Sequence, residues 1–508
     1  MSELDEAVER RLAAFDADDV VQRIWRTDHT VWASDPTEIA DRLGWLTVAE
    51  TMRPRLDELR AFARRCADDG LTTAILAGMG GSSLAPEVFR ESLGVAEGML
   101  DLLVLDTTHP DQIAAVEDRV DLDRALFVIS SKSGTTIETD SHLRYFWDRF
   151  PDPRRFVAVT DPETPLEALA RQRGFRGVFA NPHDIGGRYS ALSYFGLVPA
   201  ALIGGPLEAL LDGAIELAAA CRPGGSAASN PGVDLGVLMG EAALAGRDKL
   251  TFVLSGRIAA FGAWLEQLIA ESTGKHGTGV VPVAGESLGG PEVYGDDRMF
   301  VALGDAGADA LEELAAAGHL VVRLPDAGPR DLGREMFRWE FATAIVGAVL
   351  GINPFDQPDV QSAKDATARA LELDGDERPD PGDASAILDD VAPPDYVAIQ
   401  AYVPRDADHE THLQDARLQI RDRLRVATTL GFGPRFLHST GQLHKGGPNS
   451  VVAIQVVDPP ATDLAIPGRD VTFGRLLAAQ ADGDLAALRA RGRRAVRVDL
   501  AELETLSR

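Results

Sequence analysis

The chain contains 508 residues, 45% of them hydrophobic, which is enough for roughly two to four domains with packed cores. It carries 79 acidic and 50 basic residues, and the formal charge of −29 argues against general binding to nucleic acids or acidic membranes. Two cysteines exclude a disulfide framework, the acidic N-terminal sequence does not resemble a signal peptide, and no apolar run reaches the length of a membrane span, so we expect a cytoplasmic protein.

Strand and helix patterns alternate through the first half of the chain. Residues 1–70 are charged and have a helical pattern that ends at Gly70. Helical patterns then separate a series of short apolar runs typical of buried strands, at 71–77, 101–106, 125–130 and 156–160. A stretch rich in Gly, Pro and Ser at 221–232 predicts a linker. The alternation predicts a parallel sheet covered by helices on both faces.

The same alternation begins again after the linker. Strand patterns occur at 249–256, 279–285, 298–304 and 320–324, and a long helix is expected from about Leu332. An acidic stretch at 373–383 predicts a second linker, beyond which strands are expected at 396–403 and 451–457 and a helix around 409–426. We therefore predict an α/β protein with a helical N-terminal segment (1–70), two doubly wound parallel-sheet domains (71–225 and 226–372) and a small α/β C-terminal unit (373–508).

A glycine-rich turn, GMGGSS, lies between a strand pattern and a helix pattern at 78–83. A dinucleotide-binding loop would require Gly where Ser83 stands, and ESTGKHG, which contains a Gly-Lys pair, lacks the first glycine and the final Ser or Thr of a Walker loop. An ordinary tight turn is one interpretation. In the other, Gly80 and Gly81 allow a ligand to approach the backbone and Ser82 bonds to it.

The stretch SSKSGTT follows the strand pattern that ends at Ser130. Ser131, Ser133, Thr135 and Thr136 offer hydroxyl groups there, and Lys132 offers a positive charge. The helix that follows would add free N–H groups and a partial positive charge at its N-terminus. A plain capping cluster would need only one or two such residues. The sequence therefore predicts a site for a phosphate group, held without a metal.

Five stretches between residues 78 and 364 together resemble, in this order, the phosphoglucose isomerase family: GMGGSSLAP, SSKSGTTIET, GGRYSALSYFG, WLEQLIAESTGKHG and NPFDQPDVQSAK. The family is built from two flavodoxin-like sugar-isomerase (SIS) domains. The C-terminal FLHSTGQLHKGGPNS is most similar to bacterial isomerases that also occur fused behind transaldolase. The resemblance implies that the chain interconverts glucose 6-phosphate and fructose 6-phosphate in glycolysis and gluconeogenesis, through ring opening and a cis-enediol(ate), without cofactor or metal.

Gln267, Glu271 and Lys275 are spaced four residues apart in a largely apolar helical pattern, which predicts that they share one helix face. A solvent-exposed Glu–Lys pair on a surface helix is the alternative. Apolar neighbours raise the pKa of a carboxyl group toward that of a useful base. The resemblance makes Glu271 the base that carries a proton between C2 and C1 of the open-chain sugar, and Gln267 a substrate-binding residue beside it.

Two further stretches supply charged and polar candidates. Arg188 follows two glycines in GGRYSALS, where a fixed cation could stabilise the enediolate, and the resemblance gives it that role; an arginine at the end of a strand is the alternative. Gln357 and Lys364 lie seven residues apart in QPDVQSAK, two turns along one helix face. The resemblance implies that Gln357 helps to bind the phosphate and that Lys364 contributes to ring opening; a surface lysine is the alternative.

Ring opening in the family employs a histidine that precedes the NPFDQP stretch, where this chain offers only His319. Downstream, LHSTGQLHKGGPN contains His438 and His444. The segment HKGGPN resembles the glycine-flanked histidine segment of bacterial isomerases, so we favour His444 as a catalytic residue. We then expect the C-terminal unit, of this or of a neighbouring subunit, to complete the site, which is compatible with a homodimer.

Other functions remain open on the sequence alone. The substrates could include mannose 6-phosphate, in a dual phosphoglucose/phosphomannose isomerase, or the chain could be a non-catalytic phosphosugar-sensing SIS protein. Such a sensor usually carries a basic DNA-binding module, against which the charge of −29 argues. Glucosamine-6-phosphate synthase needs an N-terminal cysteine, where this chain has Ser2. His409 and His412 have the spacing of a helical metal pair but lack a third ligand, so we expect no metal.

Overall fold

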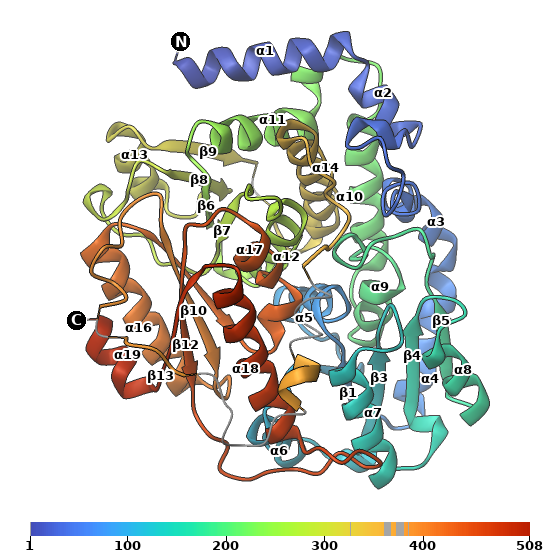
Figure 1. The fold of residues 1–508 in the computed structure, drawn as a ribbon. Coiled ribbons are helices and arrows are strands. Elements are labelled where there is room, and N and C mark those ends of the chain that lie inside the picture. The colour runs from blue at the N-terminus through green and yellow to red at the C-terminus, as the bar shows by residue number, and fades with distance from the viewer. Residues whose placement is uncertain (1, 326, 360–366, 372–379, 385, 508) are drawn as a thin grey trace.

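The residues that the structure describes fold into three parallel β-sheets covered by helices (Figure 1). The computed structural model describes residues 2–325, 327–359, 367–371, 380–384 and 386–507. The first sheet contains β1 (Thr73–Ala77), β2 (Asp101–Leu105), β3 (Ala125–Ser130), β4 (Phe156–Thr160) and β5 (Gly177–Ala180). The second contains β6 (Lys249–Val253), β7 (Val281–Val283), β8 (Arg298–Leu303) and β9 (Leu320–Leu324). The third contains β10 (Tyr396–Tyr402), β11 (Ala427–Phe432), β12 (Val451–Val457) and β13 (Arg494–Val498).

The three sheets share one winding pattern. Their strand orders are β2-β1-β3-β4-β5, β7-β6-β8-β9 and β11-β10-β12-β13, and every pair of neighbouring strands is parallel. In each sheet the first strand lies between the second and the third, which is the doubly wound order of flavodoxin-like domains. The predicted α/β fold class is therefore confirmed, whereas the residue limits of the four parts stay a prediction.

The sequence patterns missed three strands. β5 has only four residues, and β13 alternates Arg with Ala and Val, so neither is a continuous apolar run. β11 follows directly on the helix predicted around 409–426, which the structure places at Ala407–Leu424. The C-terminal unit consequently has a complete four-stranded sheet instead of the two strands expected.

Helices occupy both faces of the sheets. In the first half of the chain they are α1 (Glu3–Ala17), α2 (Val20–Trp25), α3 (Val48–Met52), α4 (Leu56–Asp68), α5 (Leu84–Leu93), α6 (Pro110–Arg119), α7 (Ile137–Arg149), α8 (Pro165–Arg173), α9 (Tyr194–Leu202), α10 (Leu207–Ala220) and α11 (Pro231–Leu244). In the second half they are α12 (Phe261–Thr273), α13 (Ala308–Ala316), α14 (Leu332–Leu350), α16 (Ala407–Leu424), α17 (Gly441–Gly446), α18 (Phe473–Ala490) and α19 (Leu500–Ser507).

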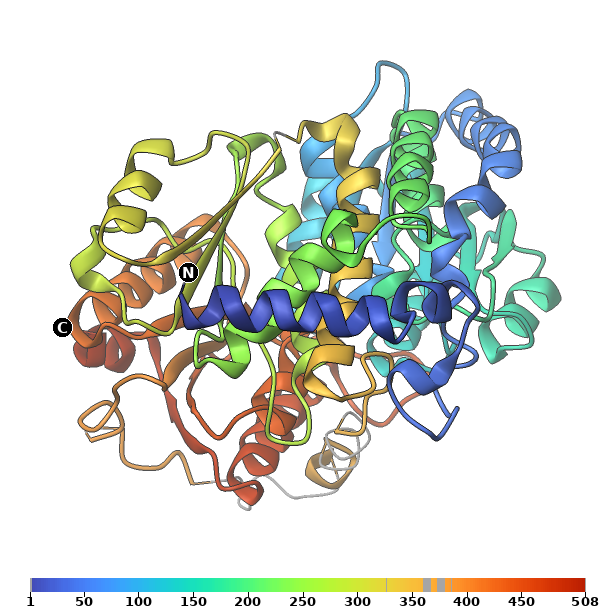
Figure 2. The same cartoon turned by 90° about the horizontal axis from the view of Figure 1, so that it is seen from above.

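Three long helices form a shared layer between the first and second sheets. α14 packs against both α10 and α11, and the predicted linker at 221–232 is the connection between the latter two (Figure 1). The N-terminal segment is helical, as expected. Its first helix, α1, lies across the molecule over α11, as Figure 2 shows from above, and Arg11 of α1 pairs with Glu241 of α11 at 2.6 Å.

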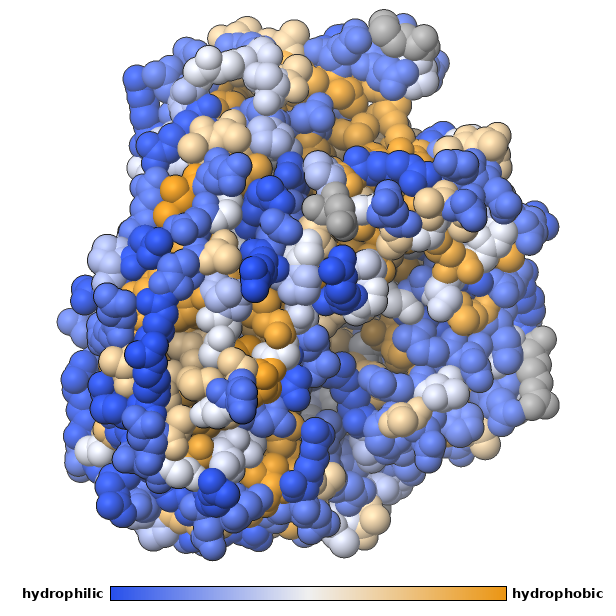
Figure 3. Space-filling view, turned by 180° about the vertical axis from the view of Figure 1, so that it is seen from behind, coloured by the Kyte–Doolittle hydropathy of each residue, from blue (hydrophilic) through white to orange (hydrophobic). Residues whose placement is uncertain are grey.

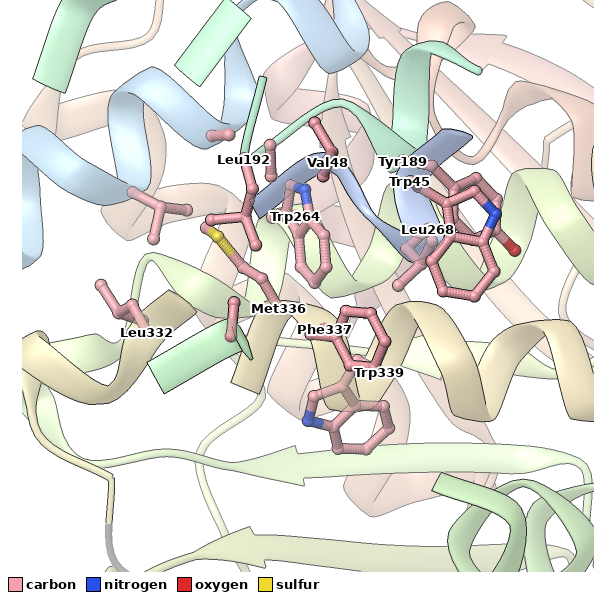
Figure 4. Packing of buried hydrophobic residues seen from close by; sticks show 14 of the residues in the cluster. Trp45, Val48, Tyr189, Leu192, Trp264, Leu268, Leu332, Met336, Phe337 and Trp339 are labelled. Atoms are coloured by element: carbon pink, nitrogen blue, oxygen red, sulfur yellow. The ribbon is translucent and has the colours of Figure 1, made fainter. Parts of the chain in front are cut away.

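The largest buried hydrophobic cluster joins the N-terminal segment, the turn at Tyr189, α12 and α14. Trp45, Tyr189 and Phe337 meet in it, with the Trp45 ring centroid 5.2 Å from that of Tyr189 and 5.8 Å from that of Phe337 (Figure 4). Trp264 of α12 and Trp339 of α14 belong to the same cluster. Burial of each large apolar side chain contributes on the order of 2 kcal/mol, so the cluster holds α12 and the turn at Tyr189 firmly.

Hydrophilic residues cover most of the rear face, with hydrophobic ones in small groups between them (Figure 3). Among the described residues, no helix combines the length and the apolar character that a membrane crossing requires.

Candidate functional site

A cavity of about 500 Å³ lies at the carboxyl ends of β1 and β3. After β1 the chain continues to β2 on one side, and after β3 it continues to β4 on the other side. The two loops therefore diverge, which leaves a crevice between them. The other walls come from η7 (Gly187–Tyr189), α12 and η12 (Arg435–His438). Small-molecule sites typically have volumes of about 300–1,000 Å³, so this cavity can hold a metabolite.

Most of the residues predicted for the site line this one cavity. They come from loops of the first sheet, from η7, from α12 and from the segment after α14. The predicted residues on the cavity wall are Gly80, Gly81, Ser82, Lys132, Ser133, Thr136, Arg188, Gln267, Glu271 and Gln357.

The two glycines after β1 allow close packing of protein segments. Gly80 has a φ of +55°, and a Cβ there would lie 2.7 Å from both Gln267 Nε2 and the His438 carbonyl oxygen. A Cβ at Gly81 would lie 2.0 Å from the carbonyl oxygen of Gly187. Their nearest neighbours are the segments that form other walls of the cavity. Both glycines also line the cavity, so the expectation that they admit a ligand stays a prediction.

The hydroxyl-rich loop divides into residues that face the cavity and residues that shape the loop. Ser133 and Thr136 line the cavity, and Thr136 precedes α7 without capping it through its side chain. Ser131 is buried and its Oγ accepts a hydrogen bond from the Gly134 N–H at 3.1 Å. Thr135 is exposed and its hydroxyl donates to Ser133 Oγ at 3.0 Å. Neither Ser131 nor Thr135 lies on the cavity wall, contrary to our expectation for ligand-contacting residues.

Lys132 has an acidic partner. Its Nζ pairs with the carboxylate of Asp161, which follows β4 and also lines the cavity. Burial raises the pKa of Asp161, against the opposing effect of the Lys132 ammonium group. The positive charge that the sequence offered to a ligand is therefore largely matched by a neighbouring carboxyl group.

Glu271 is buried in α12 and has the surroundings of a base. Gln267, one turn earlier, donates to Glu271 Oε2 at 3.2 Å and to the His438 carbonyl oxygen at 2.9 Å. The Arg188 Nη1 lies 3.5 Å from Glu271 Oε2. Burial raises the pKa of Glu271 even though the Arg188 and His438 charges act to lower it. A carboxyl group whose pKa is raised by burial is a stronger base than an exposed one and can take up and return a proton.

Arg188 connects three walls of the cavity. Its Nε donates to Ser272 Oγ at 2.8 Å, and its Nη2 donates to the carbonyl oxygens of Pro354 and Asp356 at 2.8 and 2.9 Å. The side chain is 2% exposed, so its charge acts in a poorly solvated environment beside Glu271. This fixed cation can stabilise negative charge that develops on a bound substrate.

Lys275 does not share a helix face with Gln267 and Glu271, because α12 ends at Thr273. Its buried Nζ instead donates to the carbonyl oxygens of Asn353 and Asp356 and to Asp356 Oδ1 at 2.6 Å. Burial lowers the pKa of Lys275 to about 8. The lysine thus fastens the loop that brings Gln357 to the cavity. Gln357 lies outside any helix, and Lys364 lies outside the described residues.

His438 is the histidine on the cavity wall. Its Nε2 lies 3.0 Å from Oε1 of Glu138, in the first turn of α7, and Gln480 donates to the same oxygen at 2.6 Å. Burial acts to raise the pKa of Glu138, but the His438 charge and hydrogen bond hold it below its ordinary value. The pair consists of an imidazole that can transfer a proton and a buried carboxylate that orients it.

The other two histidine candidates lie elsewhere. His444 is buried in α17, where its Nδ1 is 2.9 Å from Gln400 Nε2, and it lines a separate cavity of about 230 Å³. Burial and the neighbouring Lys445 lower the pKa of His444 to about 3. His319 packs edge-on against Tyr294 and Phe300 beside the second sheet. The structure therefore does not bring His444, the residue we favoured, to the cavity that contains Glu271.

Sequence reasoning also missed several residues of the cavity wall. Asp161 could have been found, because it follows β4 at the same carboxyl edge of the sheet. Glu138 lies behind the wall, in contact with His438, and its place in the SSKSGTTIET stretch gave no signal of a histidine partner. Glu38 and Arg42 come from the N-terminal segment, where the sequence has no signal for a site.

Comparisons with known proteins show which family the chain resembles. The phosphoglucose isomerase family model matches residues 31–297. A glucose-6-phosphate isomerase of Thermus thermophilus is 31% identical over 392 residues, which are 66% of this chain and 91% of that protein. A probable glucose-6-phosphate isomerase of Haloarcula marismortui is 28% identical and covers 63% of this chain.

Two solved structures share the fold of this chain. A hypothetical protein of Thermus thermophilus, 26% identical, superposes with a TM-score of 0.62 over 73% of this chain and 98% of its own. A glucose-6-phosphate isomerase of Chlamydia trachomatis, 20% identical, shares the fold with a TM-score of 0.58 and covers 72% of this chain and 86% of its own. The fold and the cavity define a sugar-phosphate isomerase of the α/β class. This chain belongs to the phosphoglucose isomerase family.

Proposed function

We propose that this protein interconverts glucose 6-phosphate and fructose 6-phosphate. The observation that carries the proposal is the placement of Glu271: a buried carboxyl group of raised pKa on one wall of the cavity, beside the fixed charge of Arg188. The loop with Ser133 and Thr136 lines the same cavity. A hexose phosphate can therefore reach the base with its reacting carbons while its phosphate contacts the loop.

The first step is opening of the sugar ring. We assign it to His438, which would donate a proton to the ring oxygen as the C1–O5 bond of glucose 6-phosphate breaks and the C1 hydroxyl passes its proton to solvent water. Glu138 holds the imidazole from the side away from the substrate, at 3.0 Å. This contact fixes the orientation of the imidazole, a group that can donate a proton.

The second step moves a proton between carbons. Glu271 takes the proton from C2 of the open-chain aldose, the electron pair forms the C1–C2 double bond, and the C1 carbonyl oxygen becomes the enediolate oxygen. Arg188 stabilises this oxygen. The carboxyl group of Glu271 then returns the proton to C1, while the C2 hydroxyl passes its proton to the C1 oxygen and becomes a carbonyl group. The pKa of Glu271 is raised by burial, so the carboxylate is a stronger base than an exposed one.

The phosphate position follows from the loop after β3. Ser133 and Thr136 line the cavity, and α7 begins at Ile137, directly after Thr136. Hydroxyl and backbone N–H donors at a helix N-terminus bind a phosphate dianion without a metal. Gln267 and Gln357 provide further hydrogen-bonding groups on the wall.

Several finer assignments are proposals of the same kind. We place the chain in the cytoplasm and keep the domain limits 71–225 and 226–372 given above. The similarity of its C-terminal stretch to isomerases fused to transaldolase rests on the motif FLHSTGQLHKGGPNS. His438 reaches the cavity from the same chain, so ring opening needs no histidine from a second subunit, and a homodimer is not required for it.

A coupled assay tests the proposal. The protein should convert fructose 6-phosphate to glucose 6-phosphate, detected as reduction of NADP⁺ by glucose-6-phosphate dehydrogenase, and excess EDTA should leave the rate unchanged. Mannose 6-phosphate, supplied as a second substrate, decides whether the enzyme also acts as a phosphomannose isomerase. Tight phosphosugar binding with no conversion would instead identify a sensor protein.

A further inference from the structure

A second cavity, of about 230 Å³, lies between α12 and the C-terminal unit. Ala263 and Glu266, three residues apart, present one face of α12 to it, whereas Gln267 and Glu271 face the first cavity. Its other walls include α16, β11 and η12, with His444 at one side. The mechanism described above uses none of the residues that α12 and α16 contribute to this cavity.

Two charges of opposite sign line the cavity without an ion-pair partner among the described residues. The Glu266 carboxylate accepts a hydrogen bond from the Ala284 N–H at 3.2 Å. The Arg417 guanidinium group, 1% exposed, donates to the Thr428 carbonyl oxygen at 2.7 Å and to Gln414 Oε1 at 3.5 Å. Neither has an oppositely charged group within 4.0 Å in the described part of the chain, although each affects the pKa of the other.

The remaining charges of the wall are paired. Arg405 contacts Glu87 and Glu410, and Arg435 contacts Glu87 and Asp106. Glu286, whose charge also acts on Arg417, is bonded to Arg298 and Thr428. Burial raises the pKa of Glu266 to about 7, with Arg417 as the main opposing influence. An unpaired carboxylate and an unpaired guanidinium group thus face the same small space, and both lose hydration there.

One further polar atom is unsatisfied. The Nε2 of His444 has no hydrogen-bond partner among the described residues, although the side chain is only 3% exposed. Apolar groups of Ala259, Ala260 and Phe436 complete the wall. A cavity with matched but separated charges, a free polar atom and an apolar side is suited to an amphipathic molecule smaller than a typical drug-sized ligand.

We propose that this cavity binds a small zwitterion of the α-amino-acid class, with its carboxylate on Arg417 and its ammonium group on Glu266. A simple anion would leave Glu266 facing a second negative charge, and a simple amine would leave Arg417 unmatched. A short apolar side chain, such as a methyl group, fits against the alanines of α12. The occupant would contact Phe436, two residues before His438, and Glu266, which precedes Gln267, so it would lie directly behind the active site.

The test uses the full chain and three probes of equal size: L-alanine, L-lactate, which has a hydroxyl in place of the ammonium group, and L-alaninamide, which lacks the carboxylate. Isothermal titration calorimetry and the thermal midpoint at matched ionic strength measure binding, with and without saturating fructose 6-phosphate. L-Alanine should bind saturably and unaffected by the sugar phosphate. Each of the other probes should bind at least about tenfold more weakly, because each loses one charged contact.

A variant locates the binding. Glu266→Gln removes the charge without changing the size of the side chain. It should weaken the binding of L-alanine at least about tenfold and leave the affinity for L-lactate little changed. Glu340→Gln, which replaces a buried glutamate of α14 outside the cavity, is the matched control and should bind L-alanine as the parent does. Absence of saturable L-alanine binding, equal binding of L-lactate, displacement by fructose 6-phosphate or full binding by Glu266→Gln would each overturn the proposal.

Discussion

The Nε2 of His438 lies 3.0 Å from Oε1 of Glu138, a residue 300 positions earlier in the chain. Glu138 belongs to the first turn of α7 in the first sheet's domain, and His438 to η12 in the C-terminal unit. The hydrogen bond therefore joins two parts of the chain at the wall of the cavity. Gln480 of α18 donates to the same carboxylate and in turn accepts from Thr108. The C-terminal unit completes the site by placing an imidazole there.

Replacement of His438 by Gln should slow ring opening while leaving Glu271 in place. We expect kcat with cyclic fructose 6-phosphate to fall by about 10²–10⁴-fold, the usual contribution of a general acid or base. The residual rate should stop rising with enzyme concentration, because spontaneous ring opening then supplies the open-chain sugar. The coupled assay over a range of enzyme concentrations measures both effects.

His319→Gln is the control for this experiment, because His319 packs beside the second sheet and lies outside the cavity wall. It should retain the parental rate. The assignment of ring opening to His438 would be wrong if His438→Gln were fully active. It would also be wrong if His444→Gln lost as much activity as His438→Gln.

Replacement of Glu138 by Gln tests a positioning role. The variant should lower kcat and leave KM for the phosphosugar nearly unchanged, because Glu138 acts through His438. It should also change stability with pH. The pKa of Glu138 in the folded protein is below the ordinary 4.5, so its ionised form stabilises the protein above that pH, and this contribution is lost as the pH falls through the lower folded value.

The measurement is the free energy of unfolding in urea at pH 7 and pH 3 for both proteins. The parent should lose more stability than Glu138→Gln between these two pH values. An equal loss in both, together with a raised KM, would mean that Glu138 neither pairs with His438 in solution nor acts through it.

The phosphate loop offers two adjacent threonines with different surroundings. Thr136 lines the cavity, whereas the exposed Thr135 bonds to Ser133 and lies off the wall. Thr136→Ala should raise KM for fructose 6-phosphate about tenfold or more, since a hydrogen bond to a charged group contributes about 1.5–3 kcal/mol. Thr135→Ala should leave KM unchanged in the same assay. Equal effects of the two substitutions would place the phosphate elsewhere.

The fold was predictable because its central strands are buried on both faces. The runs TAILA and ALFVIS are continuously apolar, which identifies strands of a parallel sheet without knowledge of their partners. β5 was not predicted because it is short, and β13 was not predicted because it carries two arginines. The third sheet was predicted with only two strands, because β11 follows directly on a helix and β13 is not a continuous apolar run.

The site was predictable where its residues follow strands of a single sheet or share one helix. Ser82, Thr136 and Glu271 are of this kind. The pairing of Glu138 with His438 was not, because it depends on how the C-terminal unit docks on the first sheet, which no local pattern specifies. The prediction that Lys275 shares a helix face with Gln267 and Glu271 was wrong, because α12 ends at Thr273.

Replacement of Glu271 by Gln should separate binding from catalysis. The amide keeps the size of the side chain and the contact with Gln267, so phosphosugar affinity measured by calorimetry should stay close to that of the parent. Proton transfer should be lost, with kcat reduced by at least about 10²–10⁴-fold in the coupled assay. Glu340→Gln, a change at a buried glutamate of α14 whose pKa is likewise raised by burial, should remain active.

The same variant has a second, independent consequence for stability. Because the folded pKa of Glu271 is above its ordinary value of 4.5, the unfolded chain ionises this group first as the pH rises, and folding becomes less favourable across that interval. The cost is absent below pH 4.5 and complete above the folded pKa. At pH 8, Glu271→Gln should therefore have a higher midpoint temperature of unfolding than the parent. At pH 4 this increase in the midpoint temperature should be smaller. A variant that is inactive yet gains nothing at pH 8 would show that Glu271 is not held as a buried base, and full activity would remove it from the mechanism.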